Sequence, residues 1–306
     1  MQFHSCWIAA FLVAVAAADS IAVDPVTTGE YVITQSWSQE TAFQRPYYVH
    51  VPEQAGKKRL PVFIFLHGNG GQAQEALRGF SLHRKTIASQ YITVFPQGYR
   101  ESWNIVAERS TADDRGFIEA IVARLAKADN VDPKNFTIMG SSNGSALVNQ
   151  LMIESDLPQI RNYITGVSPL NVLQYDGKDF KAKGDDNNYT VAAMPVKGKR
   201  LMNISGLKDD LVPYMGGPSR AIPGKDGTLA FVAAEESTFV WARHMGHKGK
   251  RITEPFQISG DLEVFSYLDG DVIHYKVTNE GHGAERGIPE QALLDFLKGN
   301  HGDRRK

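Results

Sequence analysis

Cysteine is almost absent from this sequence, which has one, Cys6, in 306 residues. Cys6 lies within an apolar N-terminal stretch that we expect to be removed from the mature protein. A mature chain without a thiol cannot form a disulfide, use a thiolate nucleophile or hold a metal through cysteine. Any chemistry of the mature chain must therefore come from other side chains.

An excess of charge of either sign is also missing. The chain has 33 Lys and Arg residues against 34 Asp and Glu residues, which gives a formal net charge of -1. Such a chain has no global field with which to attract nucleic acid or an anionic membrane surface. We therefore expect no nucleic-acid partner, and a neutral substrate fits this balance better than a charged one.

No apolar run in the sequence is long enough to cross a membrane comfortably. The run from Cys6 to Ala18 is nearly all apolar, ends in three alanines and precedes the first charged side chain, Asp19. It is shorter than the roughly 20 residues of a membrane span, whereas its length and its small-residue end are typical of a secretory signal peptide. The sequence predicts a signal peptide over residues 1–18, with a buried N-terminal helix as the alternative. We expect a secreted or periplasmic protein without stable membrane insertion, and a single catalytic domain over residues 19–306.

Beyond Asp19, short apolar runs alternate with stretches of helical periodicity, and no internal repeat is present. This alternation is typical of βαβ units around a mostly parallel sheet. The predicted strands are 47–51, 62–66, 92–95, 136–139, 163–167, 201–204 and 272–277. The predicted helices are one with the apolar face Phe117 to Leu125, capped by Asp113 or Asp114, and those at 145–153, 229–244 and 289–298. The pattern predicts an α/β fold with a mostly parallel central sheet and helices on both faces.

Residues 174–189 have neither the strand nor the helix periodicity. The segment is polar and contains glycine and aspartate, which favours a surface loop between two core strands. Its aromatic residues, Tyr175, Phe180 and Tyr189, leave a lid over the site as the alternative.

A Gly-x-Ser-x-Gly motif follows the predicted strand 136–139. Gly140, Ser142 and Gly144 occupy its fixed positions, and an apolar-periodic helix begins directly after it. A sharp turn between strand and helix leaves no room for side chains two residues to either side of the serine, and it projects the hydroxyl above the sheet. The motif in this setting predicts that Ser142 is a nucleophile.

A second glycine-rich turn, with the sequence HGNGG (67–71), follows the predicted strand 62–66. A serine that attacks an acyl group needs two backbone N–H groups to hold the developing oxyanion, and one of them commonly comes from a turn at this place. We assign these N–H groups to Asn69 and to Asn143, the residue after the serine. His67 precedes the donors, so we expect it to organise the loop by hydrogen bonding.

A nucleophilic serine also requires a neutral imidazole that a carboxylate orients, and with this kind of turn the chain order is serine, acid, histidine. His282 lies between the last predicted strand and the last predicted helix, where the base is expected; His274, within the strand, is the alternative. Asp209 and Asp210 both follow the predicted strand 201–204, and their position at the strand end does not choose between them.

The chain resembles an esterase family of the α/β-hydrolase superfamily, the family of polyhydroxybutyrate depolymerases, feruloyl esterases and acetylxylan esterases. The resemblance runs from about Arg45 to Leu297 and rests on short matching segments. These are RPYYVHVP (45–52), LPV (60–62), LHG (66–68), FPQG (95–98), SWN (102–104), DDRGFI (113–118), VDP (131–133), GSSNG (140–144), 209–217 and GH (281–282).

This resemblance implies an α/β-hydrolase fold and a secreted serine carboxylic ester hydrolase that needs no metal or organic cofactor. The family's acid precedes a VPYxGG element by a fixed step, and its match at 212–217 selects Asp209. The family's serine and histidine fall on Ser142 and His282. Trp103 matches a tryptophan near the substrate entrance of the family. The resemblance therefore implies a substrate contact there, with a place in the core as the alternative.

Two departures from the family pattern concern the substrate. Ser205 and Gly206 replace a His-Gly pair before the acid, and Gly283 and Ala284 replace a Trp-Pro pair after the histidine. The partner expected is an ester substrate: a feruloylated or acetylated plant polysaccharide, a polyester or a small soluble ester. The alternatives to a feruloyl or acetylxylan esterase are a polyhydroxybutyrate depolymerase, a serine peptidase of the same fold and a non-catalytic polymer-binding homologue.

Overall fold

The computed structural model describes residues 24–53, 58–108, 110–184 and 186–299. The predicted signal peptide (1–18), with Cys6, lies outside these residues. Within the described part of the chain, no helix is long and apolar enough to cross a membrane.

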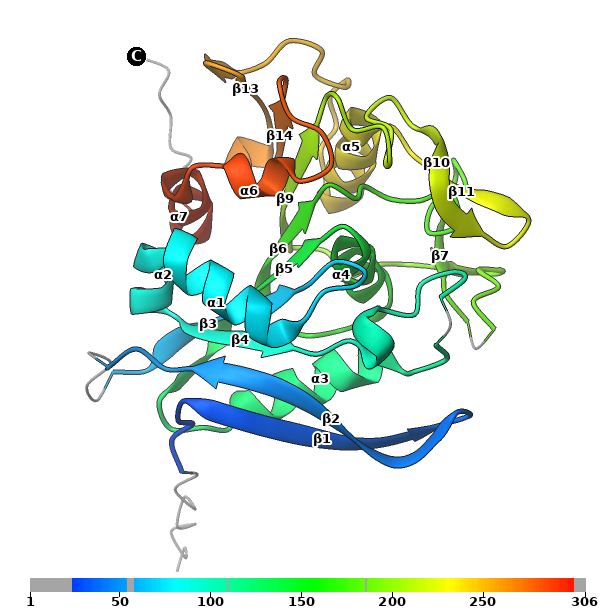
Figure 1. Cartoon of the computed structure of the whole chain (residues 1–306). Coiled ribbons are helices and arrows are strands. Elements are labelled where there is room, and N and C mark those ends of the chain that lie inside the picture. Colours follow the sequence, from blue (N-terminus) through cyan, green and yellow to red (C-terminus); the bar gives the residue numbers. More distant parts are fainter. Residues whose placement is uncertain (1–23, 54–57, 109, 185, 300–306) are drawn as a thin grey trace, which may run out of the picture.

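A ten-stranded sheet forms the centre of the protein (Figure 1). Six central strands, in the order β4-β3-β5-β6-β9-β14, are parallel, and antiparallel pairs extend the sheet at both edges. Strands β1 to β6 are Gly29–Trp37, Glu40–His50, Leu60–Leu66, Ile92–Pro96, Val131–Ser141 and Ile160–Gly166. The others in this sheet are β9 (Arg200–Gly206), β12 (Gln257–Ser259), β13 (Leu262–Tyr267) and β14 (Val272–Val277). The α/β class with a mostly parallel sheet is confirmed.

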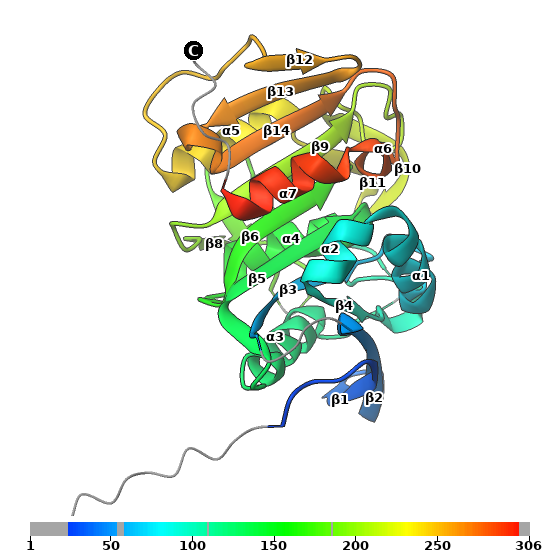
Figure 2. The same ribbon diagram turned by 90° about the vertical axis from the view of Figure 1, so that its left-hand side faces the viewer.

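Helices cover both faces of this sheet. Figure 2 shows α1 (Ala73–His83), α2 (Lys85–Gln90), α6 (Ala284–Gly287) and α7 (Glu290–Lys298) in front of it, and α3 (Asp114–Leu125), α4 (Asn143–Glu154) and α5 (Ala234–Met245) behind it. Two short 3-10 turns, η2 (Tyr99–Glu101) and η3 (Leu268–Gly270), complete the helical elements named here. Side chains that alternate along the strands separate two cores: in β3, Val62 and Ile64 pack on one face and Phe63 on the other.

All seven strands predicted from short apolar runs are present, because most of the residues in these runs are apolar and buried. The helix predicted over 229–244 is wrong at its start. Residues Gly227–Phe231 form β11, which pairs with β10 (Gly217–Gly224), and the helix begins only at Ala234. Leu229 and Phe231, two positions apart, are both buried, which is the spacing of one strand face and not of one helix face.

The segment 174–189 is only partly the surface loop that its composition favours. Phe180 begins β7 (Phe180–Ala182), which pairs with β8 (Val191–Ala193) in a small antiparallel sheet. The Phe180 ring packs on Trp241 with centroids 4.4 Å apart, and the Tyr189 hydroxyl donates to the carbonyl of Ile105 at 2.8 Å. Two of its aromatic side chains therefore fasten this segment to the body of the protein.

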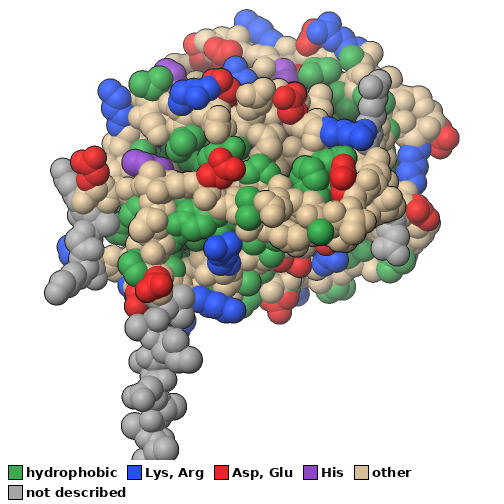
Figure 3. All heavy atoms as spheres, turned by 60° about the horizontal axis from the view of Figure 1, so that its bottom comes forward, with side chains coloured by type: hydrophobic (Ala, Val, Ile, Leu, Met, Phe, Trp, Pro, Cys, Tyr) green, Lys and Arg blue, Asp and Glu red, His purple; other side chains and the backbone are tan. Residues whose placement is uncertain are grey.

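Charged side chains are scattered over the surface. On the face shown in Figure 3, Lys and Arg side chains alternate with Asp and Glu side chains, with apolar patches between them. No extended field of one sign covers this face, in agreement with the balanced composition.

Candidate active site

Ser142 occupies the sharp turn between β5 and α4. Its backbone has φ 52° and ψ -118°, a conformation that costs a residue with a side chain on the order of 1–3 kcal/mol. The flanking glycines make the turn possible. A Cβ at Gly140 would lie 2.3 Å from the carbonyl carbon of Gly144, and a Cβ at Gly144 would lie 2.4 Å from the oxygen of Leu66. The motif found in the sequence is thus a strained turn that only glycines at these two positions allow.

A series of two hydrogen bonds connects Ser142, His282 and Asp209. The Ser142 Oγ lies 2.8 Å from His282 Nε2, and His282 Nδ1 lies 2.8 Å from Asp209 Oδ2. The carboxylate of Asp209 is 2% exposed, whereas the imidazole of His282 is 22% exposed. An imidazole that donates Nδ1–H to the carboxylate presents Nε2 as an acceptor to the serine hydroxyl. The three residues predicted from chain order and resemblance therefore meet, although 67 and 73 residues separate them along the chain.

Asp209, rather than Asp210, faces the imidazole. The remaining oxygen of Asp209, Oδ1, accepts the N–H groups of Leu211 and Val212 at 3.0 and 2.9 Å. These two bonds hold the carboxylate in one orientation. The side chain of Asp210 is 64% exposed and pairs with Arg220 at 2.7 Å.

His274, the alternative base, lies in the interior of the protein on β14. It is 1% exposed, and its Nε2 lies 2.9 Å from the hydroxyl of Tyr214. Burial lowers its pKa to about 3. The structure therefore places His274 in a buried polar contact with Tyr214 and places His282 against the serine.

The buried His274 should make the protein sensitive to mild acid. An unfolded histidine has a pKa of about 6.5, so between pH 6.5 and pH 3 the unfolded chain binds a proton that the folded chain does not. Stability is therefore complete above pH 6.5 and is lost as the pH falls through this window. His274→Gln should reduce the drop in the free energy of unfolding between pH 7 and pH 5, measured by urea titration at each pH. An unchanged drop would contradict this assignment.

The backbone N–H groups predicted to hold an oxyanion come from Asn69 and Asn143. Asn143 is the first residue of α4, where an N–H has no acceptor within the helix. Asn69 lies in the turn after β3, where Gly70 N–H bonds the carbonyl of Glu101 at 2.8 Å and Gly71 N–H bonds that of Gly68 at 3.0 Å. Gly68 brings this turn against the serine: a Cβ at Gly68 would lie 3.5 Å from the Cβ of Ser142. Both turns therefore meet at the nucleophile.

His67 organises the first of these turns, as predicted. Its Nδ1 lies 2.7 Å from the carbonyl oxygen of Gly68, and its Nε2 accepts the N–H of Gly98 at 3.0 Å. The neutral imidazole with a proton on Nδ1 satisfies both contacts. Burial lowers the pKa of His67, which favours this neutral form.

The predicted substrate contact of Trp103 is wrong in this structure, because its side chain is fully buried. The indole ring packs on the ring of His67, with centroids 5.0 Å apart, and its Nε1 donates to the His67 carbonyl at 2.8 Å. The backbone of Trp103 also binds the side chain of Asn143: its N–H donates to Oδ1 at 2.7 Å and its carbonyl accepts from Nδ2 at 3.0 Å. Trp103 therefore connects the two turns that carry the predicted oxyanion donors.

Glu108 takes part in the same contacts and was missed at the level of sequence. Its Oε1 accepts from the Nδ2 of Asn143 at 3.0 Å, and its Oε2 accepts the N–H groups of Ile105 and Val106 at 2.8 and 2.6 Å. Burial raises the pKa of this carboxyl. No motif or periodicity surrounds Glu108, so the sequence offers no signal for this role.

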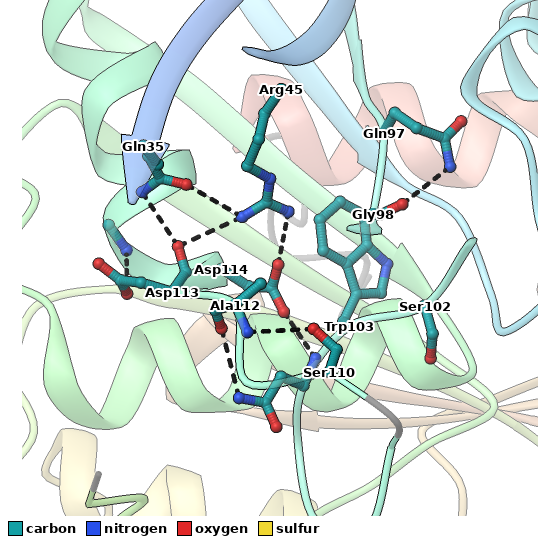
Figure 4. A network of polar contacts seen from close by, with 12 residues as sticks. Gln35, Arg45, Gln97, Gly98, Ser102, Trp103, Ser110, Ala112, Asp113 and Asp114 are labelled. Carbon is teal, nitrogen blue, oxygen red and sulfur yellow. Dashed lines mark hydrogen bonds and ion pairs between the residues drawn. The ribbon is translucent and has the colours of Figure 1, made fainter. Parts of the chain in front are cut away.

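A buried ion pair supports the loop that contains Trp103. Figure 4 shows Arg45, from β2, directed at Asp114, the first residue of α3. Arg45 Nη2 lies 2.5 Å from Asp114 Oδ1, and both side chains are nearly inaccessible to water. Asp114 also accepts the N–H of Asn104 at 2.6 Å, and the guanidinium carbon of Arg45 lies 3.9 Å from the ring centroid of Phe117. Removal of one partner from such a pair leaves an uncompensated buried charge. Through the bond to Asn104, this ion pair holds in place the loop that contains Trp103.

Glu285 is a second carboxylate that sequence reasoning missed. It is 3% exposed and accepts the hydroxyl of Ser141 at 2.7 Å, one residue before the nucleophile. Arg84 fixes the backbone around it by donating to the carbonyls of Glu285, Arg286 and Ile288. Glu285 thus connects the α6 segment, which follows His282, with the turn at Ser142.

The described residues contain no group of three or more His, Cys, Asp or Glu side chains placed to hold a metal ion.

The sequence matches no family model. Over 249 residues it is 24% identical to feruloyl esterase B of Piromyces equi; the matched region covers 79% of this chain and 42% of that protein. Over 99 residues it is 31% identical to the putative esterase NocK of Nocardia uniformis subsp. tsuyamanensis; the matched region covers 31% of this chain and 29% of that protein. The chain spans less than half of the length of these relatives. The predicted resemblance to esterases is confirmed at this level.

Solved structures with the same fold are also esterases by name. The acetyl xylan esterase from Aspergillus awamori superimposes with a TM-score of 0.57 at 12% identity and covers 89% of this chain and 99% of its own. Est1E from Butyrivibrio proteoclasticus gives a TM-score of 0.50 at 14% identity and covers 89% of this chain and 100% of its own. At these identities the similarity establishes the fold, which is that of the α/β-hydrolases.

Proposed function

We propose that this chain is a serine carboxylic ester hydrolase that works through an acyl-enzyme. The observation that carries the proposal is the hydrogen-bonded series from Ser142 Oγ through His282 to the buried Asp209, with the serine on a strained turn. Serine is a weak nucleophile at neutral pH, and this series supplies the base and the carboxylate that activate it.

The reaction follows from the placement of these groups. His282 Nε2 takes the hydroxyl proton while Ser142 Oγ bonds to the ester carbonyl carbon, and the carboxylate of Asp209 stabilises the imidazolium. The N–H groups of Asn69 and Asn143 hold the oxyanion of the tetrahedral intermediate; removal of one such donor typically costs about 3–4 kcal/mol of barrier stabilisation. His282 then protonates the departing alcohol, and a water molecule repeats the attack on the acyl-enzyme.

A feruloyl or acetylxylan esterase is the proposed type. Feruloyl esterase B and an acetyl xylan esterase are among the proteins to which the chain is similar, and the balanced charge suits an uncharged ester of a plant polysaccharide. We also propose that residues 1–18 are a signal peptide and that the enzyme is secreted or periplasmic, on the strength of the apolar run that ends at Ala18.

The first test is covalent labelling together with a substrate panel. A fluorophosphonate probe should modify Ser142, identified by mass spectrometry of the labelled peptide. The purified chain should hydrolyse methyl ferulate or acetylated xylan faster than polyhydroxybutyrate, and a matched amide should be cleaved far more slowly than its ester. A chain that is neither labelled nor active on any ester would be the non-catalytic homologue. Preference for the amide would make it a peptidase.

A further inference from the structure

Two hydrogen bonds join the same two short segments of the chain at the candidate active site. Ser142 Oγ lies 2.8 Å from His282 Nε2, and the neighbouring hydroxyl of Ser141 donates to Oε1 of Glu285 at 2.7 Å. On one segment the two bonded residues are adjacent, and on the other they are three positions apart. The two bonds therefore close a small ring, in which each bond brings the partners of the other together.

Glu285 packs directly against the backbone that carries the nucleophile. Its side chain is buried, and its stem lies on Gly166, where an added Cβ would be 2.7 Å from both Cβ and Cγ of Glu285. Gly166 of β6 is the register partner of Ser141, and its carbonyl accepts the N–H of Ser142 at 2.8 Å. A shift of Glu285 would therefore be felt at the turn that holds the serine.

The loop that contains His282 is anchored on both sides. Before the histidine, the carbonyl of Glu280 accepts the N–H of Lys208, just after β9, at 2.9 Å. After the histidine, Arg84 donates to the carbonyls of Glu285 and Ile288 at 3.1 and 2.6 Å. These contacts tie the loop to β9 and to the start of α2, whereas the side chain of Glu285 ties it to the nucleophile turn.

The second oxygen of Glu285 is an unusual feature of a buried carboxylate. Oε2 has no hydrogen-bond partner within the described part of the chain. The guanidinium of Arg286 is 85% exposed and lies 3.8 Å from Oε1, too far for a hydrogen bond. A buried carboxylate oxygen without a donor is costly, and an apolar side chain of similar volume would serve the stability of the fold as well. The carboxylate therefore calls for a functional explanation.

We propose that Glu285 is a positioning residue, which acts through Ser141 to fix the distance and the angle at which His282 meets Ser142. The proposal rests on the proposed esterase function. A base that is aligned before the substrate arrives avoids the entropy cost of alignment, and a misplacement of about 1 Å can cost about 100-fold in rate. Because His282 acts in both acylation and deacylation, loss of this alignment should lower kcat and leave KM nearly unchanged.

The main test removes both partners of the bond in Ser141→Ala/Glu285→Met. Methionine keeps the unbranched stem that packs on Gly166, and removal of both polar groups leaves neither one buried without its partner, so the thermal midpoint should fall by no more than a few degrees. For p-nitrophenyl acetate, kcat should fall about tenfold or more and KM should stay within about twofold. The rate of labelling by a fluorophosphonate should fall with kcat. An unchanged kcat in the folded double variant would overturn the proposal.

The single variants distinguish positioning from general damage. Ser141→Ala and Glu285→Met should each lower kcat as far as the double variant does, because each breaks the same bond. Glu285→Gln keeps an acceptor for the Ser141 hydroxyl, so its kcat should return to within about threefold of the wild type. Losses that multiply in the double variant, or a Glu285→Gln variant as slow as Glu285→Met, would contradict the assignment.

The matched control is Glu290→Met. Glu290, the first residue of α7, is also a carboxylate that joins distant segments, since its Oε1 accepts the N–H of Ile87 in α2 at 2.9 Å. The substitution should lower the thermal midpoint by up to several degrees and leave kcat within about twofold. A fall in kcat equal to that of Glu285→Met would mean that any loosening of these helices slows the reaction, and it would count against a specific role of Glu285.

The position of the imidazole separates this proposal from the esterase function itself. In crystals of the wild type, His282 Nε2 should lie within hydrogen-bond distance of Ser142 Oγ, and in the double variant the separation should exceed about 3.5 Å. An imidazole displaced in this way, in a chain that hydrolyses no ester, would retain the positioning role and exclude the esterase. Hydrolysis by the wild type, together with an imidazole that stays in place in the double variant, would retain the esterase and exclude the positioning role.

Discussion

Ser142→Ala should abolish ester hydrolysis, with a fall in kcat of about 10⁶-fold, the scale seen when a serine hydrolase loses its nucleophile. The substitution removes the only atom that bonds to the acyl carbon, and no thiol or second hydroxyl shares its contact with His282 in the described residues. Turnover of a p-nitrophenyl ester under conditions of excess substrate measures the effect. Retained turnover would show that another group performs the reaction.

The fold of the Ser142→Ala variant should remain intact. Alanine removes one oxygen, the backbone strain at φ 52° is the same for both residues, and the His282 ring, whose Nε2 loses its hydrogen bond, is partly exposed to water. The thermal midpoint should therefore change by no more than a few degrees. His282→Ala should lower activity nearly as far, because the hydroxyl then has no base.

Asp209→Asn should lower kcat by about 10⁴-fold while the geometry stays in place. The amide oxygen can still accept the N–H groups of Leu211 and Val212, but the amide nitrogen then faces Nδ1 of His282. A donor at that position favours the imidazole with its proton on Nε2, which cannot accept the serine proton. The pH dependence of kcat/KM, measured with one ester for the wild type and for Asp209→Asn, should differ because the protonation of His282 has changed.

Asp210→Asn is the matched control for that experiment. The two residues are adjacent and of the same type, but Asp210 is exposed and pairs only with Arg220, which is 67% exposed. Such a surface pair contributes about 0–1 kcal/mol, so activity should stay within about twofold. A large loss with Asp210→Asn and none with Asp209→Asn would reverse the assignment of the acid.

Local sequence patterns were sufficient to predict the strand, the turn and the helix around Ser142. The strand 136–139, the glycines around Ser142 and the helix that follows are consecutive in the chain, so the constraint that produces the turn is visible within ten residues. His282 could be found because it is the one histidine between the last predicted strand and the last predicted helix. Strand-end position left Asp209 and Asp210 equal, and only the resemblance at 212–217 separated them before the structure placed Asp209 on the imidazole.

The residues that were missed or misjudged act across long distances in the chain. Trp103 contacts a turn 36 residues away and Glu108 one 35 residues away. Glu285 lies 144 residues from the serine whose hydroxyl it accepts. A tryptophan next to an entrance and a tryptophan in a core look alike in sequence, because exposure depends on what the rest of the chain places over the ring.

The sequence by itself determined the α/β alternation, the central strands, the nucleophile turn and the order in which a serine, an acid and a histidine follow one another. These depend on periodicity and on steric limits between neighbouring residues. Tertiary structure alone decided that Trp103 is buried and that Glu108 and Glu285 hold the turn around Ser142 through Asn143 and Ser141. Those features depend on which distant side chains share the same space, and burial and hydrogen bonding are fixed only once the sheet and its helices have packed.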